Sequence, residues 1–192
     1  MSSSSTPRIV RKHTPDKRLT ESTYRSAFDA LMKDFGMRCA YSLVHVEACG
    51  GRVCMEIDHH NPKLEGDARH DYNNLFPATR HCNHAKSNKW PSSEDRDKGI
   101  RFLNPCEEGD YNVQIFEKED GKLVGTTVAA RYHIAELNLN ADDLVRDRLF
   151  RKDIRQLITK LHISDPDLLS AMRRVIHTSI PPIDPPPDCG GT

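Results

Sequence analysis

The sequence predicts an α+β fold, in which a core of two strands and a short helix is flanked by further helices and by an additional β-hairpin. Three observations lead to this prediction. Apolar residues recur at helical spacing between Tyr24 and Phe35. A strand, a polar loop, a second strand and a short helix follow one another within residues 53–89. An Asp-Gly turn at 120–121 divides an apolar-rich stretch into two strands.

The first half of the chain is predicted element by element from its start and stop signals. Gly36 stands where a left-handed residue ends the first helix. The glycine pair at 50–51 indicates a turn into a strand at Val53–Ile57, which places the next two residues at a strand end. After a polar loop, the sequence "NNLF" starts a second extended segment. Thr79 is then predicted to cap a helix that reaches Lys89.

The second half is predicted to contain the hairpin within 111–128 and two helices. Asn140 is expected to cap a helix with one apolar face that extends to Leu161, and another helix is expected at Pro166–His177. The tail "PPIDPPPDCGGT" is too rich in proline to pair with a core. The resulting organisation is a flexible basic arm at 1–19, a helix with the central core at 20–100, a hairpin and helical extension at 101–179, and a disordered tail at 180–192. For the arm, phosphate contact is the alternative to solvation.

Composition restricts the classes of function. Lys and Arg total 28 and Asp and Glu total 28 in the 192 residues, so no global positive field draws the chain onto nucleic acid. The six cysteines show no small-scaffold spacing and the amino terminus has no apolar signal segment, which together predict a cytoplasmic protein with reduced thiols. No apolar run approaches the roughly 20 residues of a membrane span, so we expect no membrane association.

The stretch "MEIDHHNPK" carries the strongest candidate for chemistry. Hydrolysis of a phosphodiester needs a base that activates water and a cation at the scissile phosphate. His59 is able to act as the base at neutral pH, and Asp58 offers oxygen to a hard cation. Asn83, on the predicted helix across the loop, offers an amide oxygen from the facing side. This ligand set suits Mg²⁺ or Mn²⁺ better than a soft metal.

These residues resemble the HNH endonuclease family, the ββα-metal nucleases. The resemblance rests on "EIDHHNP" and "YNNLFPATRHCNHAK" and covers about residues 39–91. It implies a ββα-metal core in which His59 is the catalytic base and Asp58 and Asn83 are metal ligands. It selects Asn74, which precedes a leucine, as the middle asparagine, with a place in the catalytic centre and a role in holding the loop that carries His59. The family chemistry implies 5′-phosphate and 3′-hydroxyl products.

The zinc positions of the family are only half retained. Many HNH proteins hold a structural zinc with two C-x-x-C pairs, whereas here the corresponding segments are Cys39 to Ser42 and Thr79 to Cys82. Hydroxyl groups do not replace thiolates as zinc ligands, so we expect no structural zinc and expect both cysteines to pack in the core. Cys49, Cys54 and His81 are the alternative donors for a rebuilt site.

Substrate and partner expectations follow from local charge and from the remaining resemblance. Arg80, Lys86 and Lys89 lie on or beside the predicted helix and are the candidate DNA contacts. The carboxyl-terminal half resembles HNH proteins of antiphage defence operons, the Septu type and its retron-associated relatives, which implies an ATPase subunit as partner. The leading hypothesis is therefore a metal-dependent DNA endonuclease. A non-catalytic ββα module that binds nucleic acid or a partner, and an RNA-cleaving toxin, are the alternatives.

Overall fold

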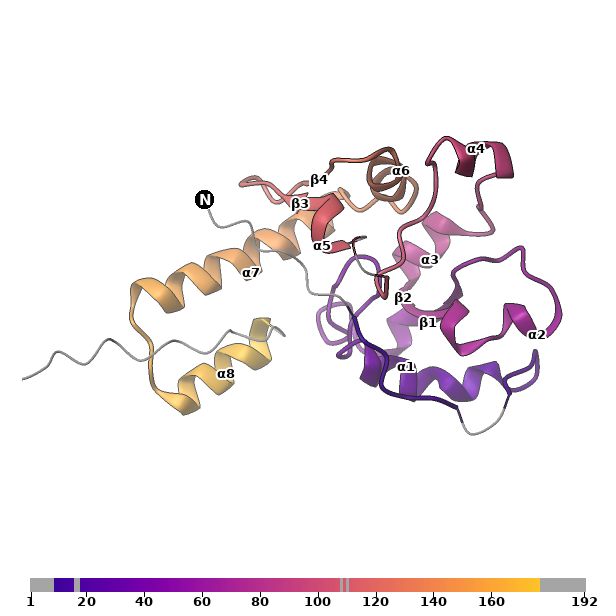
Figure 1. Cartoon of the computed structure of the whole chain (residues 1–192). Coiled ribbons are helices and arrows are strands. Elements are labelled where there is room, and N and C mark those ends of the chain that lie inside the picture. The colour runs from indigo at the N-terminus through magenta and orange to yellow at the C-terminus, as the bar shows by residue number, and fades with distance from the viewer. Residues whose placement is uncertain (1–8, 16–17, 108, 110, 177–192) are drawn as a thin grey trace, which may run out of the picture. The chain divides into compact units, whose positions relative to one another are not determined.

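The computed structural model describes residues 9–15, 18–107, 109 and 111–176, and it has the predicted α+β character (Figure 1). The expectations for residues 1–8 and for the proline-rich tail lie outside these ranges. The helices are α1 (Phe28–Asp34), α2 (Gly66–Arg69), α3 (Arg80–Lys86), α4 (Ser93–Asp97), α5 (Tyr111–Gln114), α6 (Val128–Glu136), α7 (Asp142–Lys160) and α8 (Pro166–Ile176). The strands are β1 (Met55–His59), β2 (Leu75–Thr79), β3 (Ile115–Glu117) and β4 (Leu123–Gly125), and 3-10 turns occupy Tyr24–Ala27, Arg52–Cys54 and Tyr72–Asn74.

The centre of the fold is an antiparallel pair of strands followed directly by a helix. β1 pairs with β2 in a register that sets Asp58 opposite Phe76 and His59 opposite Leu75. Thr79 ends β2 and caps α3, because its Oγ1 accepts the backbone N–H of Cys82 at 3.4 Å. The predicted cap is thus confirmed. The helix ends at Lys86 instead of Lys89, since Ser87 turns into the left-handed region with φ of 49°.

The first strand begins later than the sequence pattern predicts. Both glycines of the 50–51 pair have positive φ, and the 3-10 turn Arg52–Cys54 follows them before extended backbone starts at Met55. Val53 is consequently 72% exposed and contributes nothing to the core. The strand then continues through His59, so the two candidate site residues lie inside β1 and not beyond its end.

The core is shared by the central elements and by part of the predicted extension. Leu31 of α1 packs with Tyr72 and Leu75 in one cluster, and a larger cluster combines residues from 32–82 with residues from 102–144. The helical stop at Gly36 is confirmed, with φ of 57°. Because one cluster spans both sides of residue 100, the hairpin and α6 are part of the same folded unit as the central strands.

The second strand pair is shorter than predicted. Residues 111–114 form the helix α5, and only β3 and β4 pair, around a turn at Gly121 with φ of 75°. Gly125 lets β4 approach α6 closely, since a Cβ there would stand 2.6 Å from the backbone of Ala130. Helix α7 begins at Asp142, two residues after Asn140. The amide of Asn140 accepts from the Leu123 backbone N–H at 2.7 Å and donates to the Leu123 carbonyl at 2.9 Å. It therefore fixes the edge of β4.

The described part of the basic arm, residues 9–15, lies against the core. Arg11 donates to the carbonyls of Tyr72 and Leu75 at 2.8 and 2.9 Å, and its guanidinium stands 4.7 Å from the centre of the Phe76 ring. The carboxylate of Asp34 accepts the backbone N–H of Lys12 at 2.9 Å. Arg11 thus serves the fold, which the expectation of a solvated arm did not include.

The chain divides into two compact units, residues 1–147 and 148–192, with the division inside α7. Leu144 is buried in the core of the first unit, and Ile158 is buried in the second. Among the residues that the structure describes, no helix has the length and apolar character needed to cross a membrane.

Candidate functional site

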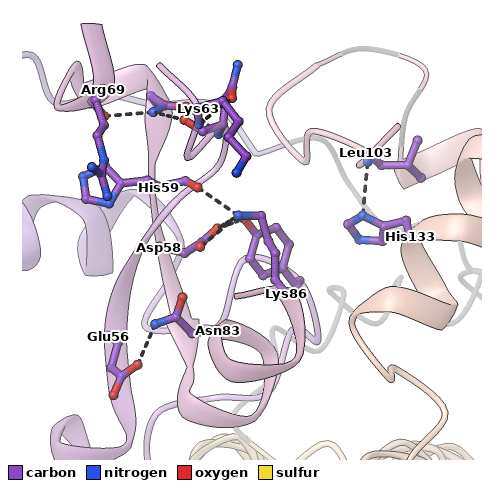
Figure 2. A network of polar contacts seen from close by, with 12 residues as sticks. Glu56, Asp58, His59, Lys63, Arg69, Asn83, Lys86, Leu103 and His133 are labelled. Carbon is purple, nitrogen blue, oxygen red and sulfur yellow. Dashed lines mark hydrogen bonds and ion pairs between the residues drawn. The ribbon is translucent and has the colours of Figure 1, made fainter. Parts of the chain in front are cut away.

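Three of the predicted site residues meet in one cleft between β1 and α3. Its volume is about 400 Å³. The cleft is lined by Ile57, Asp58, His59, Pro62, Arg69, Asn83, His84, Ser87 and Asn88. Asp58, His59 and Asn83 therefore lie together, as the spacing of their segments predicts, and Figure 2 shows them on facing elements.

Local geometry explains why these side chains converge. Side chains two residues apart in a strand share a face, so Glu56 and Asp58 point to the same side of β1. Side chains three apart in a helix are neighbours, which places Asn83 and Lys86 on one side of α3. The two faces meet: Asn83 Nδ2 donates to Glu56 Oε2 at 2.6 Å, and Lys86 Nζ donates to Asp58 Oδ1 at 3.0 Å (Figure 2).

Asp58 is a buried carboxylate with internal partners. It is 4% exposed, and it accepts hydrogen bonds from Lys86 and from the hydroxyl of Tyr41. Lys86 is fully buried and also donates to the carbonyl of His59 at 2.8 Å. Burial raises the pKa of Asp58 and lowers the pKa of Lys86, and the attraction between the two charges opposes both shifts. The pair ties the end of β1 to the last turn of α3.

This arrangement corrects the expected role of Lys86. The prediction took Lys86 as a surface contact to phosphate, but its side chain is 0% exposed and is bonded to Asp58 and His59. The other two predicted substrate cations lie at the surface and have acidic partners. Arg80 Nε is 3.2 Å from Glu56 Oε1, and Lys89 Nζ is 2.8 Å from Glu136 Oε2 on α6.

The oxygen atoms of the cleft fit a hard divalent cation. A carboxylate has about four acceptor positions. Lys86 approaches both oxygens of Asp58 at 3.0 Å and Tyr41 takes a second position on Oδ2, which leaves one position on Oδ1. The amide of Asn83 gives its nitrogen to Glu56, and Figure 2 shows its oxygen on the side of Asp58. Within the described ranges, no three His, Cys, Asp or Glu side chains gather as a ready metal site, so any cation here would depend on Asp58, Asn83 and water.

His59 is linked to a second histidine, His70, which directly follows α2. His59 Nε2 lies 3.1 Å from His70 Nδ1, and His70 Nε2 lies 2.8 Å from Glu21 Oε2. Tyr24 covers both rings, with centroid distances of 5.0 Å to His59 and 5.1 Å to His70. His70 is only 5% exposed. Glu21, His70 and His59 thus form a chain of polar contacts from the surface carboxylate of Glu21 to the cleft.

The hydrogen-bond chain indicates which nitrogen of His59 is able to act as a base. A carboxylate only accepts, so His70 Nε2 carries the hydrogen shared with Glu21. In a neutral His70 ring, Nδ1 then accepts from the Nε2–H of His59, which leaves Nδ1 of His59 as the basic nitrogen. Burial, together with the positive charge of Arg69, lowers the pKa of His59 to about 4, so the ring is neutral at pH 7.

Asn74 holds the loop that carries these groups. Its Oδ1 accepts the backbone N–H of Asn61 at 2.8 Å, and its Nδ2 donates to the carbonyls of Asn61 and Arg69 at 3.2 and 2.8 Å. The side chain does not line the cleft. Asn74 is therefore a positioning residue. It holds the backbone at Asn61 and at Arg69, on the two sides of the loop.

The half-retained zinc positions also meet in the structure. Cys39 and Cys82 are both fully buried and interact with each other. The Sγ atom of Cys39 accepts the backbone N–H of Ser42 at 3.4 Å and the hydroxyl of Thr79 at 3.8 Å. The four positions thus form one buried cluster that joins the loop before β1 to the start of α3.

Several residues in the cleft or bonded to its side chains were not identified from the sequence. Tyr41 and Glu56 bond the two predicted metal ligands, and Arg69 and His70 flank the predicted base. The period-two pattern of β1 is the one signal that would have found Glu56.

No protein-family model, no curated protein and no solved structure matches the chain.

Proposed function

We propose that this protein is a metal-dependent endonuclease of the HNH type, with β1, β2 and α3 as its ββα-metal core. The observation that carries the proposal is the single cleft in which Asp58, His59 and Asn83 meet. A neutral imidazole beside two hard oxygen donors is the combination that phosphodiester hydrolysis requires.

His59 acts as the general base. Its Nδ1 takes a proton from the attacking water, while its Nε2–H stays bonded to His70. Glu21 and Tyr24 hold His70, and Asn74 holds the loop between the two histidines, so the ring keeps one orientation. His70 and Asn74 are positioning residues in this scheme.

Asp58 and Asn83 are the residues that would hold Mg²⁺ or Mn²⁺. When bound, the cation supplies positive charge to the scissile phosphate and to the leaving oxygen. Lys86 keeps Asp58 in place from the core side, and Glu56 keeps the Asn83 amide turned with its oxygen toward Asp58. Both oxygen donors are thus positioned before any cation binds.

The substrate is DNA, and the chain works with a partner that brings DNA to it. A protein that neutralises several phosphates normally has surplus basic residues, whereas 28 Lys and Arg balance 28 Asp and Glu here. Of the three basic residues expected to contact DNA, one is buried and two are paired with acids. An ATPase subunit of an antiphage defence complex is the partner that the sequence resemblance favours.

One observation favours a second candidate, a non-catalytic module that binds nucleic acid or a partner. The carboxylate of Asp58 is already bonded to the ammonium of Lys86. A divalent cation would have to share this carboxylate with an internal positive charge, which weakens its binding.

A plasmid assay tests the proposal and separates the two candidates. The purified chain should convert supercoiled DNA to nicked or linear forms with Mg²⁺ and should fail to do so with EDTA. The Asp58→Asn variant keeps the shape of the side chain but loses its charge, and it should lose most of this activity. Cleavage in EDTA, or full activity of Asp58→Asn, would contradict the assigned metal site. DNA binding without cleavage, also after addition of candidate ATPase partners, would favour the binding module.

A further inference from the structure

The basic residues around the cleft differ in whether an acidic side chain already pairs with them. Arg80, Lys86 and Lys89 each have an acidic partner within 3.2 Å. Arg69 also lines the cleft, beside His59. Within the part of the chain that the structure describes, its side chain makes no hydrogen bond or ion pair, and its Nε is buried without a partner. Arg69 is thus a guanidinium with donors available in the cleft.

An unpartnered guanidinium donor is unfavourable in the free protein. A buried N–H group without an acceptor has lost its hydrogen bond to water and has gained none in return. A bound anion removes this cost, and the planar fork of arginine matches two oxygens of one phosphate. The Nε–H group of Arg69 therefore has a hydrogen-bond acceptor when a phosphate group is bound and lacks one when the phosphate is absent.

The position of Arg69 is fixed by its backbone and not by its side chain. Arg69 is the last residue of α2, and its carbonyl accepts from Asn74 Nδ2 at 2.8 Å. Figure 2 shows this bond and shows the side chain extending toward His59. The positive charge of Arg69 also contributes to the lowered pKa of His59, which agrees with their closeness. The same asparagine thus places both the base and the guanidinium.

Arg69 also borders a second hollow, whose charges restrict where an anion binds. This hollow is lined by Thr20, Glu21, Leu64, Glu65, Gly66, Asp67, Arg69 and His70. Three of these side chains are acidic, and they repel phosphate. An anion that meets Arg69 is therefore favoured on the cleft side, next to His59.

We infer that Arg69 binds the non-bridging oxygens of a nucleic-acid phosphodiester in the cleft, next to His59. The inference rests on the proposed function in one respect, because it takes a nucleic-acid phosphate as the ligand. It assigns to Arg69 the contact that the sequence had assigned to Lys86. Arg69 holds the phosphate where the water activated by His59 reaches its phosphorus atom.

The test is binding of a short fluorescent DNA duplex in EDTA and at low salt, where no cleavage occurs. Arg69→Gln should weaken binding by about 10- to 100-fold, the loss expected for a charge-assisted bidentate contact. Arg69→Lys restores the charge without the fork and should recover part of the affinity. The matched control is Arg52→Gln, which removes the same charge from a surface residue paired with Asp29 and should change affinity by less than about threefold.

The outcomes separate this inference from the proposed function. Unchanged binding by a folded Arg69→Gln variant overturns the inference, and so does an equal loss in Arg52→Gln or no binding by the wild-type chain. If Arg69→Gln does not fold, Arg69→Lys decides, because wild-type affinity in that variant excludes a bidentate contact. Weakened binding by Arg69→Gln in a chain that never cleaves DNA supports the inference while the nuclease proposal fails. Cleavage by Arg69→Gln with unchanged kcat and KM retains the nuclease and removes the role of Arg69.

Discussion

Two regions of the molecule each contain a histidine within a hydrogen-bond network, and the two rings differ in how many of their nitrogens have a hydrogen-bond partner. In the layer formed by α5 and α6, His133 Nδ1 accepts the backbone N–H of Leu103 at 3.1 Å, and its Nε2 bonds the hydroxyl of Tyr111. In the cleft, His59 Nε2 contacts His70, and no described residue bonds Nδ1. A ring with both nitrogens used holds the fold together, whereas a ring with one open nitrogen in a cleft is available for chemistry.

The two rings also show that a shifted pKa alone does not identify a catalytic histidine. Burial lowers the pKa of His133 well below its ordinary value, and burial with nearby positive charge lowers the pKa of His59 to about 4. Both rings are neutral at pH 7. Only His59 combines this state with access to a cleft that also contains Asp58 and Asn83.

The largest effect on cleavage is expected from replacing His59, the histidine with one unbonded ring nitrogen. His59→Ala should reduce Mg²⁺-dependent cleavage by about 10²- to 10⁴-fold, because it removes the general base. Its thermal unfolding should remain close to that of the wild type, since the ring is half-buried at the edge of the core. The measurement is initial cleavage rate together with circular dichroism.

The neighbouring histidine provides the control for this prediction. His60 packs edge-on against Phe76 and Trp90, with centroid distances of 5.0 and 5.3 Å. His60→Phe retains an aromatic ring in this place and should cleave at a rate near the wild type. An inactive His60→Phe beside an active His59→Ala would show that the base is assigned one residue too early.

The next largest effect concerns the buried ion pair beneath the cleft. Lys86→Met should lower the free energy of unfolding by about 3–5 kcal/mol, because it leaves the Asp58 charge buried without its partner. Urea denaturation measures this change. The double variant Asp58→Asn with Lys86→Met removes both charges and should be more stable than Lys86→Met alone. Equal stability of the two variants would mean that Asp58 does not need Lys86.

The central elements could be predicted because their signals are local. The cap at Thr79, the stop at Gly36 and the extended segment before Thr79 each depend on a few adjacent residues, and the structure confirms them. The joint placement of Asp58 and Asn83 followed from the order of these elements. Local patterns therefore predicted the main positions of the cleft.

The side-chain contacts could not be predicted, because no helical or strand periodicity in the sequence relates the residues that they join. His70 meets Glu21 across 49 positions of the chain, and His133 meets Leu103 across 30. Helical spacing placed Lys86 on the same face as Asn83 but did not show that this face is buried. Asn140 has the residue type of a helix cap, and its residue type did not show that its amide also bonds both backbone groups of Leu123 at the strand edge.

A smaller effect is expected from replacing His133, whose two ring nitrogens are both bonded. His133→Ala should destabilise the fold by about 2–4 kcal/mol, since it creates a cavity and leaves the Leu103 N–H without its acceptor. Differential scanning calorimetry measures the loss. Cleavage below the unfolding temperature should be unchanged, and a loss of activity in the folded variant would contradict a purely structural role.

The same histidine makes stability depend on pH. Its pKa is lowered in the folded state, so the unfolded chain binds the extra proton as the pH falls below about 6.5. The stabilising contribution is complete above that pH and declines on acidification by about 1.4 kcal/mol per pH unit for each such histidine. His59 adds a second contribution between 6.5 and about 4. His133→Asn retains an acceptor for Leu103 but does not titrate, so urea midpoints between about pH 7.5 and pH 5.5 should fall less than in the wild type.

The smallest expected effect is at the surface, where Lys89 on the segment after α3 pairs with Glu136 of α6. Lys89 Nζ is 2.8 Å from Glu136 Oε2, and the lysine is 49% exposed. Water and salt screen such a pair, so Lys89→Gln should change the free energy of unfolding by no more than about 1 kcal/mol. The variant also compares Lys89 with Arg69, whose side chain has no acidic partner among the described residues. If DNA uses Lys89 as the sequence suggested, Lys89→Gln should reduce the salt dependence of DNA binding by about one phosphate contact. We expect no such reduction, because Glu136 already neutralises this lysine; a slope reduced in Lys89→Gln and unchanged in Arg69→Gln would reverse the two assignments.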